Sequence, residues 1–279
     1  MKLKREMKIH KIVSPAKINL NLKVINFDEL LKKHRLSSRI AIVKLHDEIE
    51  IYHSNKLSIT YRDRNEKKLL IKDDIIKKTI KYFDKKYKKK STFNILIKKQ
   101  IPIGYGLGGG SSNAASILKY LYKFNNLNEK NFFVDAPELG SDVLLFYDQS
   151  PKIIDGIKSY KLFNNSKPRW RKIHLIFPTT KNLTASIFSH FRRNSKNEKK
   201  IEKLFNNDLL GSSLALNKEF LEIHTLLLQN KKKISFFGMS GSGSCIFLSF
   251  DKISSEKSII QLIQLNFPLV RIEKSYYFG

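Results

Sequence analysis

Residues 102–112 form the segment of the chain best suited to bind an anion, because five of these eleven residues are glycine. Glycine has no Cβ, so its backbone reaches positive φ easily and a ligand can come close to the peptide N–H groups. A helix is expected directly afterwards, from Ala114 to Tyr122, and its start adds unpaired N–H groups and the positive end of a helix dipole. We therefore expect a polyphosphate cradle, and the plainer alternative is a flexible turn. The residues assigned to it are Pro102, Ile103, Gly104, Tyr105, Gly106, Leu107, Gly108, Gly109, Gly110, Ser111 and Ser112.

The residue types in 102–112 limit which kind of phosphate-binding loop this segment can be. Ser111 and Ser112 can add hydroxyls to a phosphate or to a magnesium ion. No Lys-Ser or Lys-Thr pair closes the loop, so it is not a Walker A motif. It also lacks the βαβ setting of a dinucleotide fingerprint. A second Gly/Ser loop at 238–244 is weak by itself, but with the first it suggests two backbone surfaces around one anionic ligand.

Three side chains are candidates for phosphoryl-transfer chemistry beside these loops. Lys17 and Asn19 lie two positions apart in an alternating stretch, so they point to the same side of the predicted strand. Lys17 could supply a cation, and its alternative is an ordinary solvated lysine. Asp142 precedes an apolar run and could orient or deprotonate a hydroxyl, whereas a carboxylate there is also typical of a helix cap or a turn.

Local patterns predict the elements that must hold these residues. In the first half they predict strands at 17–24, 39–53 and 92–99 and helices at 68–84 and after the glycine segment. In the second half they predict strands at 172–177, 234–237, 244–250 and 269–277, with helices within 184–230 and 255–265. The mixture without a regular βαβ repeat favours an α+β fold. The polar stretch 148–168 suggests a boundary between an ATP-binding domain, 1–156, and a substrate domain, 157–279.

The amino-acid composition limits which kinds of site, partner and location are expected. The chain has 279 residues, one cysteine (Cys245) and a formal net charge of +28. One cysteine excludes a disulfide within the chain and a cysteine-based zinc site. The positive excess is mostly lysine spread along the chain, so we expect no specific nucleic-acid partner, although such a charge attracts anions. No apolar stretch reaches the length of a membrane helix, and the expected location is the cytoplasm.

Three motifs in order resemble those of the GHMP kinase superfamily. They are 15–20 (PAKINL), 102–112 and 240–243 (SGSG). The PAKINL opening, the LGSDV segment that contains Asp142, and Asn207-Asp208-Leu209 are most similar to the branch that acts on 4-diphosphocytidyl-2-C-methyl-D-erythritol. The resemblance covers about 14–250. It implies a two-domain fold, ribosomal-S5-like and then ferredoxin-like, and phosphorylation of the 2-hydroxyl of that cytidine diphosphate conjugate by ATP, in the non-mevalonate route to isoprenoid precursors.

The resemblance also implies roles for single residues. Asp142 is the base or positioning carboxylate, Lys17 stabilises charge, and 102–112 holds the ATP phosphates, with Ser112 as a magnesium ligand. The implied substrate contacts are Asn19, His34, Thr184, Phe188, Gly241, Ser242 and Gly243. One element departs from the pattern, because Lys32-Lys33-His34 stands where the family has Gly-Tyr-His, so one aromatic face for the cytosine is missing. The alternatives are a polar loop residue for His34 and core packing for Phe188.

Three functions stay open from the sequence alone. The first is the kinase of the cytidine diphosphate conjugate, and the second is a kinase of another small alcohol such as homoserine or mevalonate. The third is a basic binding protein without catalytic activity. For the enzyme we expect ATP and Mg²⁺ as cofactors, a small-molecule substrate, no membrane partner, and a monomer or weak homodimer.

Overall fold

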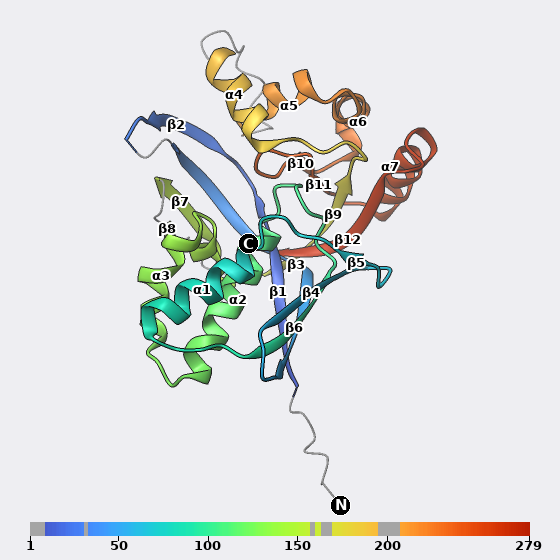
Figure 1. The fold of residues 1–279 in the computed structure, drawn as a ribbon. Coiled ribbons are helices and arrows are strands. Elements are labelled where there is room, and N and C mark those ends of the chain that lie inside the picture. Colours follow the sequence, from blue (N-terminus) through green and yellow to red (C-terminus); the bar gives the residue numbers. More distant parts are fainter. Residues whose placement is uncertain (1–8, 31–32, 157–159, 163–168, 195–206) are drawn as a thin grey trace, which may run out of the picture. The chain divides into compact units, whose positions relative to one another are not determined.

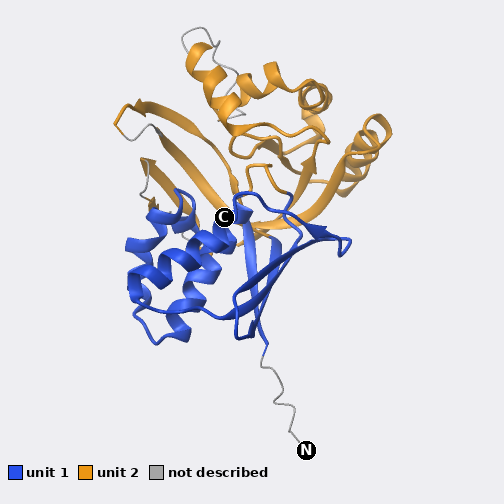
Figure 2. Cartoon of the chain, viewed as in Figure 1, with its two compact units in different colours: residues 1–16, 45–102, 108–148 blue, residues 17–44, 103–107, 149–279 orange. Residues whose placement is uncertain are grey.

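The computed structural model describes residues 9–30, 33–156, 160–162, 169–194 and 207–279. The chain forms two compact units, which Figure 2 shows in two colours. Unit 1 consists of 1–16, 45–102 and 108–148, and unit 2 of 17–44, 103–107 and 149–279. The units are therefore interleaved along the sequence, whereas the predicted domains, 1–156 and 157–279, are consecutive. The division into those domains stays a prediction.

The strands of unit 1 surround β6 (Phe93–Lys99). The second part of β3 (Lys33–His53) pairs with β6 in antiparallel register, with Ile51 opposite Ile95, and β4 (Ser58–Asp63) runs parallel to β6 on its other side. Alternate residues of β6 are buried, which is the period expected of a strand with one face on the core. The short β5 (Lys68–Leu69) pairs with β4, and residues 10–16 of β1 (His10–Asn19) also belong to this unit.

Helices α1 (Ile75–Tyr87), α2 (Gly109–Phe124) and α3 (Phe132–Leu139) lie side by side in unit 1 (Figure 1). The Asp74 side chain caps α1 by accepting from the N–H of Lys77 at 2.9 Å. Two short 3₁₀ turns complete the layer, η1 (Glu129–Asn131) and η2 (Val143–Phe146).

A buried carboxylate joins the three helices. Asp135 of α3 accepts hydrogen bonds from the hydroxyls of Tyr122 (2.5 Å), Tyr87 (2.7 Å) and Tyr82 (3.0 Å), and it pairs with Lys86. These donors hold the pKa of Asp135 below its usual value even though burial alone would raise it. The tyrosines come from α1 and α2, so one charged group fixes the packing of all three helices.

Unit 2 contains a four-strand run in the order β10 (Phe236–Met239), β11 (Ile246–Ser249), β9 (Trp170–Phe177) and β12 (Arg271–Phe278), with every neighbouring pair antiparallel. The far edge of β12 pairs with the first part of β3, where Tyr277 lies opposite Val43.

Three more strands of unit 2 extend the sheet from the first part of β3, two of them paired with it directly. These are β2 (Lys23–Asp28), which pairs with 33–37, β7 (Lys152–Gly156), which pairs with 36–40, and β8 (Tyr160–Leu162), which pairs with β7.

The helices of unit 2 pack over a hydrophobic core made with β9, β10 and β11. The helical segments of unit 2 are α4 (Thr184–Asn194), α5 (Leu210–Leu216), α6 (Lys218–Gln229), the 3₁₀ turn η3 (Lys231–Lys233) and α7 (Ile253–Asn266). In α6 the buried residues Phe220, Ile223 and Leu227 recur at helical spacing, which explains why this face turns inward.

The α+β class is confirmed, and most predicted elements are present. Two predictions are wrong in detail. The strand at 17–24 is interrupted, because β1 (His10–Asn19) ends before β2 begins. Its alternation also fails at 16–19, where every residue is buried, so both faces of β1 are covered at this end. The helix at 68–84 begins only at Ile75, since 68–69 pairs as β5.

Among the residues that the structure describes, no helix combines the length and the apolar character needed to cross a membrane.

Candidate functional site

In unit 2 the backbone N–H groups of Lys17 and Asn19 bind the two glycine loops, and their side chains bind each other. Lys17 Nζ donates to Asn19 Oδ1 at 2.6 Å, and the Lys17 backbone N–H donates to the carbonyl of Leu107 at 3.0 Å. The Asn19 N–H donates to Ser240 Oγ at 3.2 Å, and Ser240 Oγ donates to the carbonyl of Gly106 at 3.0 Å. Three segments far apart in the sequence are thus joined by hydrogen bonds at the end of β1.

Asn19 has a further partner that the sequence did not indicate. Its Nδ2 donates to Ser38 Oγ on β3 at 2.7 Å, which fixes the amide so that its oxygen faces Lys17. Lys17 and Asn19 are both almost fully buried. The pair is therefore rigidly placed, which is what a residue that stabilises transferred charge requires.

The glycines of the first loop are needed for conformation and for space. Gly104, Gly106 and Gly108 have φ of +88°, +74° and +69°. A Cβ on Gly106 would lie 2.2 Å from the carbonyl oxygen of Ser240, so only glycine allows the two loops to approach. The side chain of Tyr105 binds elsewhere in unit 2, because its hydroxyl donates to the carbonyl of Pro178 at 2.6 Å.

The second glycine loop is held by asparagine side chains. Asn207 Nδ2 donates to the carbonyls of Met239 (2.8 Å) and Gly241 (2.9 Å), which gives the Asn-Asp-Leu element a structural task. Asn182 Nδ2 donates to the carbonyl of Ser242 (2.8 Å). Sequence reasoning missed Asn182, and its only local signal is an amide in a Thr/Asn-rich turn, a type that often binds backbone groups.

In unit 1 the N-terminus of α2 has the features of an anion site. Its N-cap is Gly108, which offers no side-chain hydrogen bond to the first turn, so those backbone N–H groups have no side-chain cap. Gly109, Gly110 and Ser111 form this turn, followed by the fully buried Ser112. An anion at this end would be stabilised by the N–H groups and by the dipole of a 16-residue helix.

Asp142 lies in unit 1 directly before η2, which packs against α2. Asp142 lies in a turn at the N-cap position of η2, as the structural alternative predicts, but its side chain makes no capping hydrogen bond to η2. The carboxylate is half-buried. Its catalytic role stays a prediction.

Two residues predicted to contact a base lie together in unit 2. The rings of His34 on β3 and Phe188 on α4 are stacked, with centroids 4.7 Å apart and planes at 21°. Phe27 on β2 packs edge-on against His34 at 4.9 Å, and the guanidinium of Arg192 lies over Phe27. Burial lowers the pKa of His34, and the positive charge of Arg192 lowers it further, so the imidazole is neutral at pH 7.

Thr184 and Ser242 are brought together as well. Thr184 Oγ1 at the start of α4 lies 2.9 Å from Ser242 Oγ. Ser242 is flanked by Gly241 and Gly243, both at positive φ, so this polar pair sits on the second glycine loop. Of the altered Lys32-Lys33-His34 element, Lys32 lies outside the described residues.

The described part of the chain contains no group of three or more His, Cys, Asp or Glu side chains that could hold a metal ion. Ser112 remains the one side chain assigned to magnesium. A lone hydroxyl suits an ion that arrives on a nucleotide, because Mg²⁺ keeps several waters and is bound largely through substrate phosphates.

Comparison with known proteins gives a consistent result. A family model described as the GHMP kinases N terminal domain matches residues 74–147, which include the whole first glycine loop, α2 and Asp142. A protein of Sulfurihydrogenibium sp. named 4-diphosphocytidyl-2-C-methyl-D-erythritol kinase is 30% identical over 263 residues, covering 85% of this chain and 90% of its own. One of the same name from Pelagibacter ubique is 34% identical over 263 residues, covering 88% and 90%.

Solved structures show the same fold. A crystal structure of 4-(cytidine 5'-diphospho)-2C-methyl-D-erythritol kinase has a TM-score of 0.74 at 21% identity, and the likeness covers 97% of this chain and 100% of that one. The mevalonate kinase of Methanococcus jannaschii has a TM-score of 0.60 at 17% identity, covering 98% of both chains.

Proposed function

Because this chain belongs to the 4-diphosphocytidyl-2-C-methyl-D-erythritol kinase family of GHMP kinases, we propose that it transfers the γ-phosphoryl group of ATP to the 2-hydroxyl of that conjugate. The observation that carries the proposal is the hydrogen-bonded set of Lys17, Asn19, Gly106, Leu107 and Ser240. It joins a buried cation to two loops of the kind that bind phosphates.

The transfer needs positioning and charge stabilisation more than covalent chemistry by the protein. We assign Lys17 the stabilisation of negative charge on the transferred group, and Asn19 the orientation of Lys17. Asp142 orients the attacking hydroxyl and receives its proton. The hydroxyl oxygen forms the new bond to the γ-phosphorus, and the bond from that phosphorus to the bridging oxygen breaks, which releases ADP.

The nucleotide phosphates are assigned to 102–112. The open first turn of α2 supports this assignment, because its N–H groups have no side-chain cap and the helix dipole favours negative charge there. Mg²⁺, bound with the nucleotide, would neutralise charge on the phosphates, and Ser112 is the residue that would contact it.

The cytidine part is assigned to His34, Phe188 and Thr184, with Gly241, Ser242 and Gly243 on the adjoining loop. A neutral imidazole both donates and accepts a hydrogen bond, as recognition of the uncharged cytosine edge requires. Phe188 and His34 stack face to face and cover each other, so a base that uses these faces would have to separate the two rings.

The test is a phosphoryl-transfer assay with the purified chain, ATP and Mg²⁺. We expect turnover of 4-diphosphocytidyl-2-C-methyl-D-erythritol and none of mevalonate or homoserine, each followed by release of ADP and by mass of the product. Turnover of another alcohol with no reaction of the conjugate would contradict the proposed substrate. No transfer to any alcohol, together with salt-sensitive binding of nucleic acid, would favour the basic binding protein instead.

A further inference from the structure

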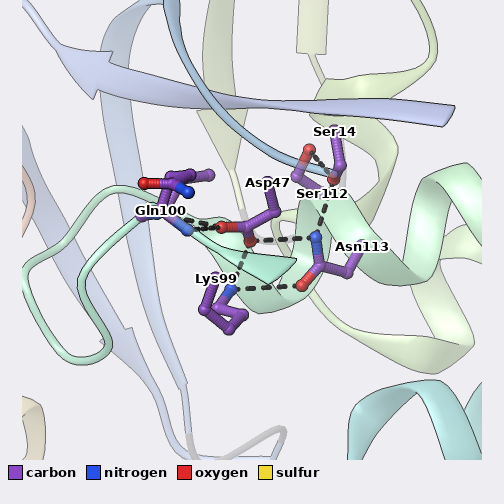
Figure 3. Close-up of polar contacts among 7 residues, drawn as sticks. Ser14, Asp47, Lys99, Gln100, Ser112 and Asn113 are labelled. Carbon is purple, nitrogen blue, oxygen red and sulfur yellow. Dashed lines mark hydrogen bonds and ion pairs between the residues drawn. The ribbon is translucent and has the colours of Figure 1, made fainter. Parts of the chain in front are cut away.

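A buried carboxylate lies beneath the glycine loop in unit 1 and has no part in the chemistry assigned above. Asp47 on β3 is completely buried. Its Oδ1 accepts from the backbone N–H groups of Gln100 (2.8 Å) and Ile101 (2.9 Å), directly before the loop, and its Oδ2 accepts from Asn113 Nδ2 (3.0 Å) and pairs with Lys99 (Figure 3). One side chain therefore ties the entrance of the loop to the helix that follows it.

Asn113 connects the ion pair of Asp47 and Lys99 to Ser14, and its amide group is held in one orientation. Its Oδ1 accepts from Lys99 Nζ at 3.2 Å, so its two amide hydrogens face Asp47 and Ser14, and Nδ2 donates to Ser14 Oγ at 2.8 Å. With the amide turned over, its NH₂ group would face the ammonium and its oxygen would face the carboxylate. The ion pair thus fixes which end of the amide faces Ser14.

Ser14 is the last member before the loop. Its Oγ accepts from Asn113, and its own hydroxyl donates to Ser112 Oγ at 2.8 Å, with both serines fully buried (Figure 3). Ser112 Oγ therefore accepts from Ser14. This bond ties the buried Ser112, and with it the start of α2, to the network around Asp47.

The free-energy cost of burying the ion pair of Asp47 and Lys99 argues that the network has a role in nucleotide binding. A buried ion pair contributes little to stability compared with apolar residues of the same volume, because both charges lose their hydration. Here the pair also immobilises one amide and two hydroxyls that end at the first turn of α2. A network whose members are all hydrogen-bonded orients a side chain firmly.

We infer that Asp47, Lys99, Asn113 and Ser14 are positioning residues that hold Ser112, and with it the N–H groups at the start of α2, in place for a bound nucleotide phosphate. The inference rests on the proposed function, because it takes 102–112 as the ATP-binding loop. Ser14 acts through Ser112 and does not itself touch the ligand.

The test is a double-mutant cycle on equilibrium binding of a non-hydrolysable ATP analogue with Mg²⁺, measured by calorimetry without the acceptor substrate. We expect Ser14→Ala to weaken binding roughly tenfold, comparable to the loss of one hydrogen bond to a charged group. In the Ser112→Ala background the same change should have less than about a twofold effect on binding. Ser14 acts through the hydroxyl of Ser112, and that background lacks this hydroxyl. Asp47→Asn should weaken binding at least as much as Ser14→Ala.

Ser116→Ala is the matched control, because Ser116 is another buried serine of α2 that does not belong to this network. We expect it to leave analogue affinity unchanged, and thermal unfolding of each variant separates stability from affinity. If Asp47→Asn does not fold, the cycle of Ser14 and Ser112 still decides.

Equal effects of Ser14→Ala in both backgrounds, or wild-type affinity in Ser14→Ala, would overturn the inference while the proposed function stands. A chain that binds the analogue with the expected coupling but phosphorylates no methylerythritol conjugate would support the inference and contradict the proposed substrate.

Discussion

Lys17 and Asn19 show how far a single residue can be interpreted before its partners are known. Strand alternation predicted that the two side chains share a face, and Lys17 Nζ does donate to Asn19 Oδ1. The partners of Asn19, Ser38 and Ser240, are 19 and 221 residues away in sequence, so no local pattern could reveal them. The same is true of Asp47, whose sequence neighbours resemble those of any strand residue.

For Asp142 the decisive change is Asp142→Asn, which keeps the shape of the side chain but removes a proton acceptor. We expect kcat to fall by about 100-fold or more, the usual contribution of a general base, with ATP affinity nearly unchanged. Steady-state kinetics and nucleotide binding measure the two effects. Glu138→Gln is the control, because it removes one negative charge from an exposed side chain of α3 in the same unit. A mild effect of Asp142→Asn would remove Asp142 from the mechanism.

Elements with a strong local pattern were predicted well, and elements defined by pairing were not. β6 and α2 follow alternating and helical patterns, and both were found. β4 and β7 were missed, because the first lies in a polar stretch and the second in the supposed boundary region. Each is stabilised by its partner strand, β6 or β3, rather than by its own residues.

The first glycine loop allows a matched comparison of two positions with the same backbone requirement. Gly106 and Gly104 both have positive φ, but a Cβ on Gly106 would meet the Ser240 carbonyl oxygen at 2.2 Å, whereas on Gly104 it would meet only the flexible Lys181 chain at 3.6 Å. Gly106→Ala should therefore raise the KM for ATP about tenfold or more, while Gly104→Ala carries only the strain of its φ, about 1 kcal/mol.

Kinetics and thermal unfolding of the two alanine variants measure this difference. Equal behaviour of the pair would mean that the close approach of the two loops has no part in ATP binding.

At the scale of the whole molecule, the net charge of +28 is a property that the sequence gives directly. It establishes no fold, but it attracts anionic substrates such as ATP and a cytidine diphosphate conjugate. We expect kcat/KM to fall about threefold or more between 50 and 500 mM salt, because screening shortens the range of this attraction, while kcat changes little. Initial rates across a salt series measure this, and a kcat/KM that does not depend on salt would show that long-range charge does not assist capture.

The order of the two units along the chain was beyond the sequence patterns. The chain passes between the units at 16–17, 44–45, 102–103, 107–108 and 148–149, and the last of these lies at the start of the polar stretch where a boundary was predicted. The passages at 16–17 and 44–45 fall inside β1 and β3, whose two parts belong to different units. The hydropathy pattern along a strand does not show at which residue its partner strands change.

The position of β12 has a consequence for how the protein is made. This strand lies between β9 and the first part of β3, although it follows every other strand of unit 2 along the chain. A growing chain on the ribosome therefore exposes the edge of β9, with its buried run from Ile173 to Phe177, until translation has passed Phe278. A premature stop codon before Arg271 would leave that apolar edge open for good, and such a fragment is a substrate for chaperones and proteases rather than a shortened enzyme.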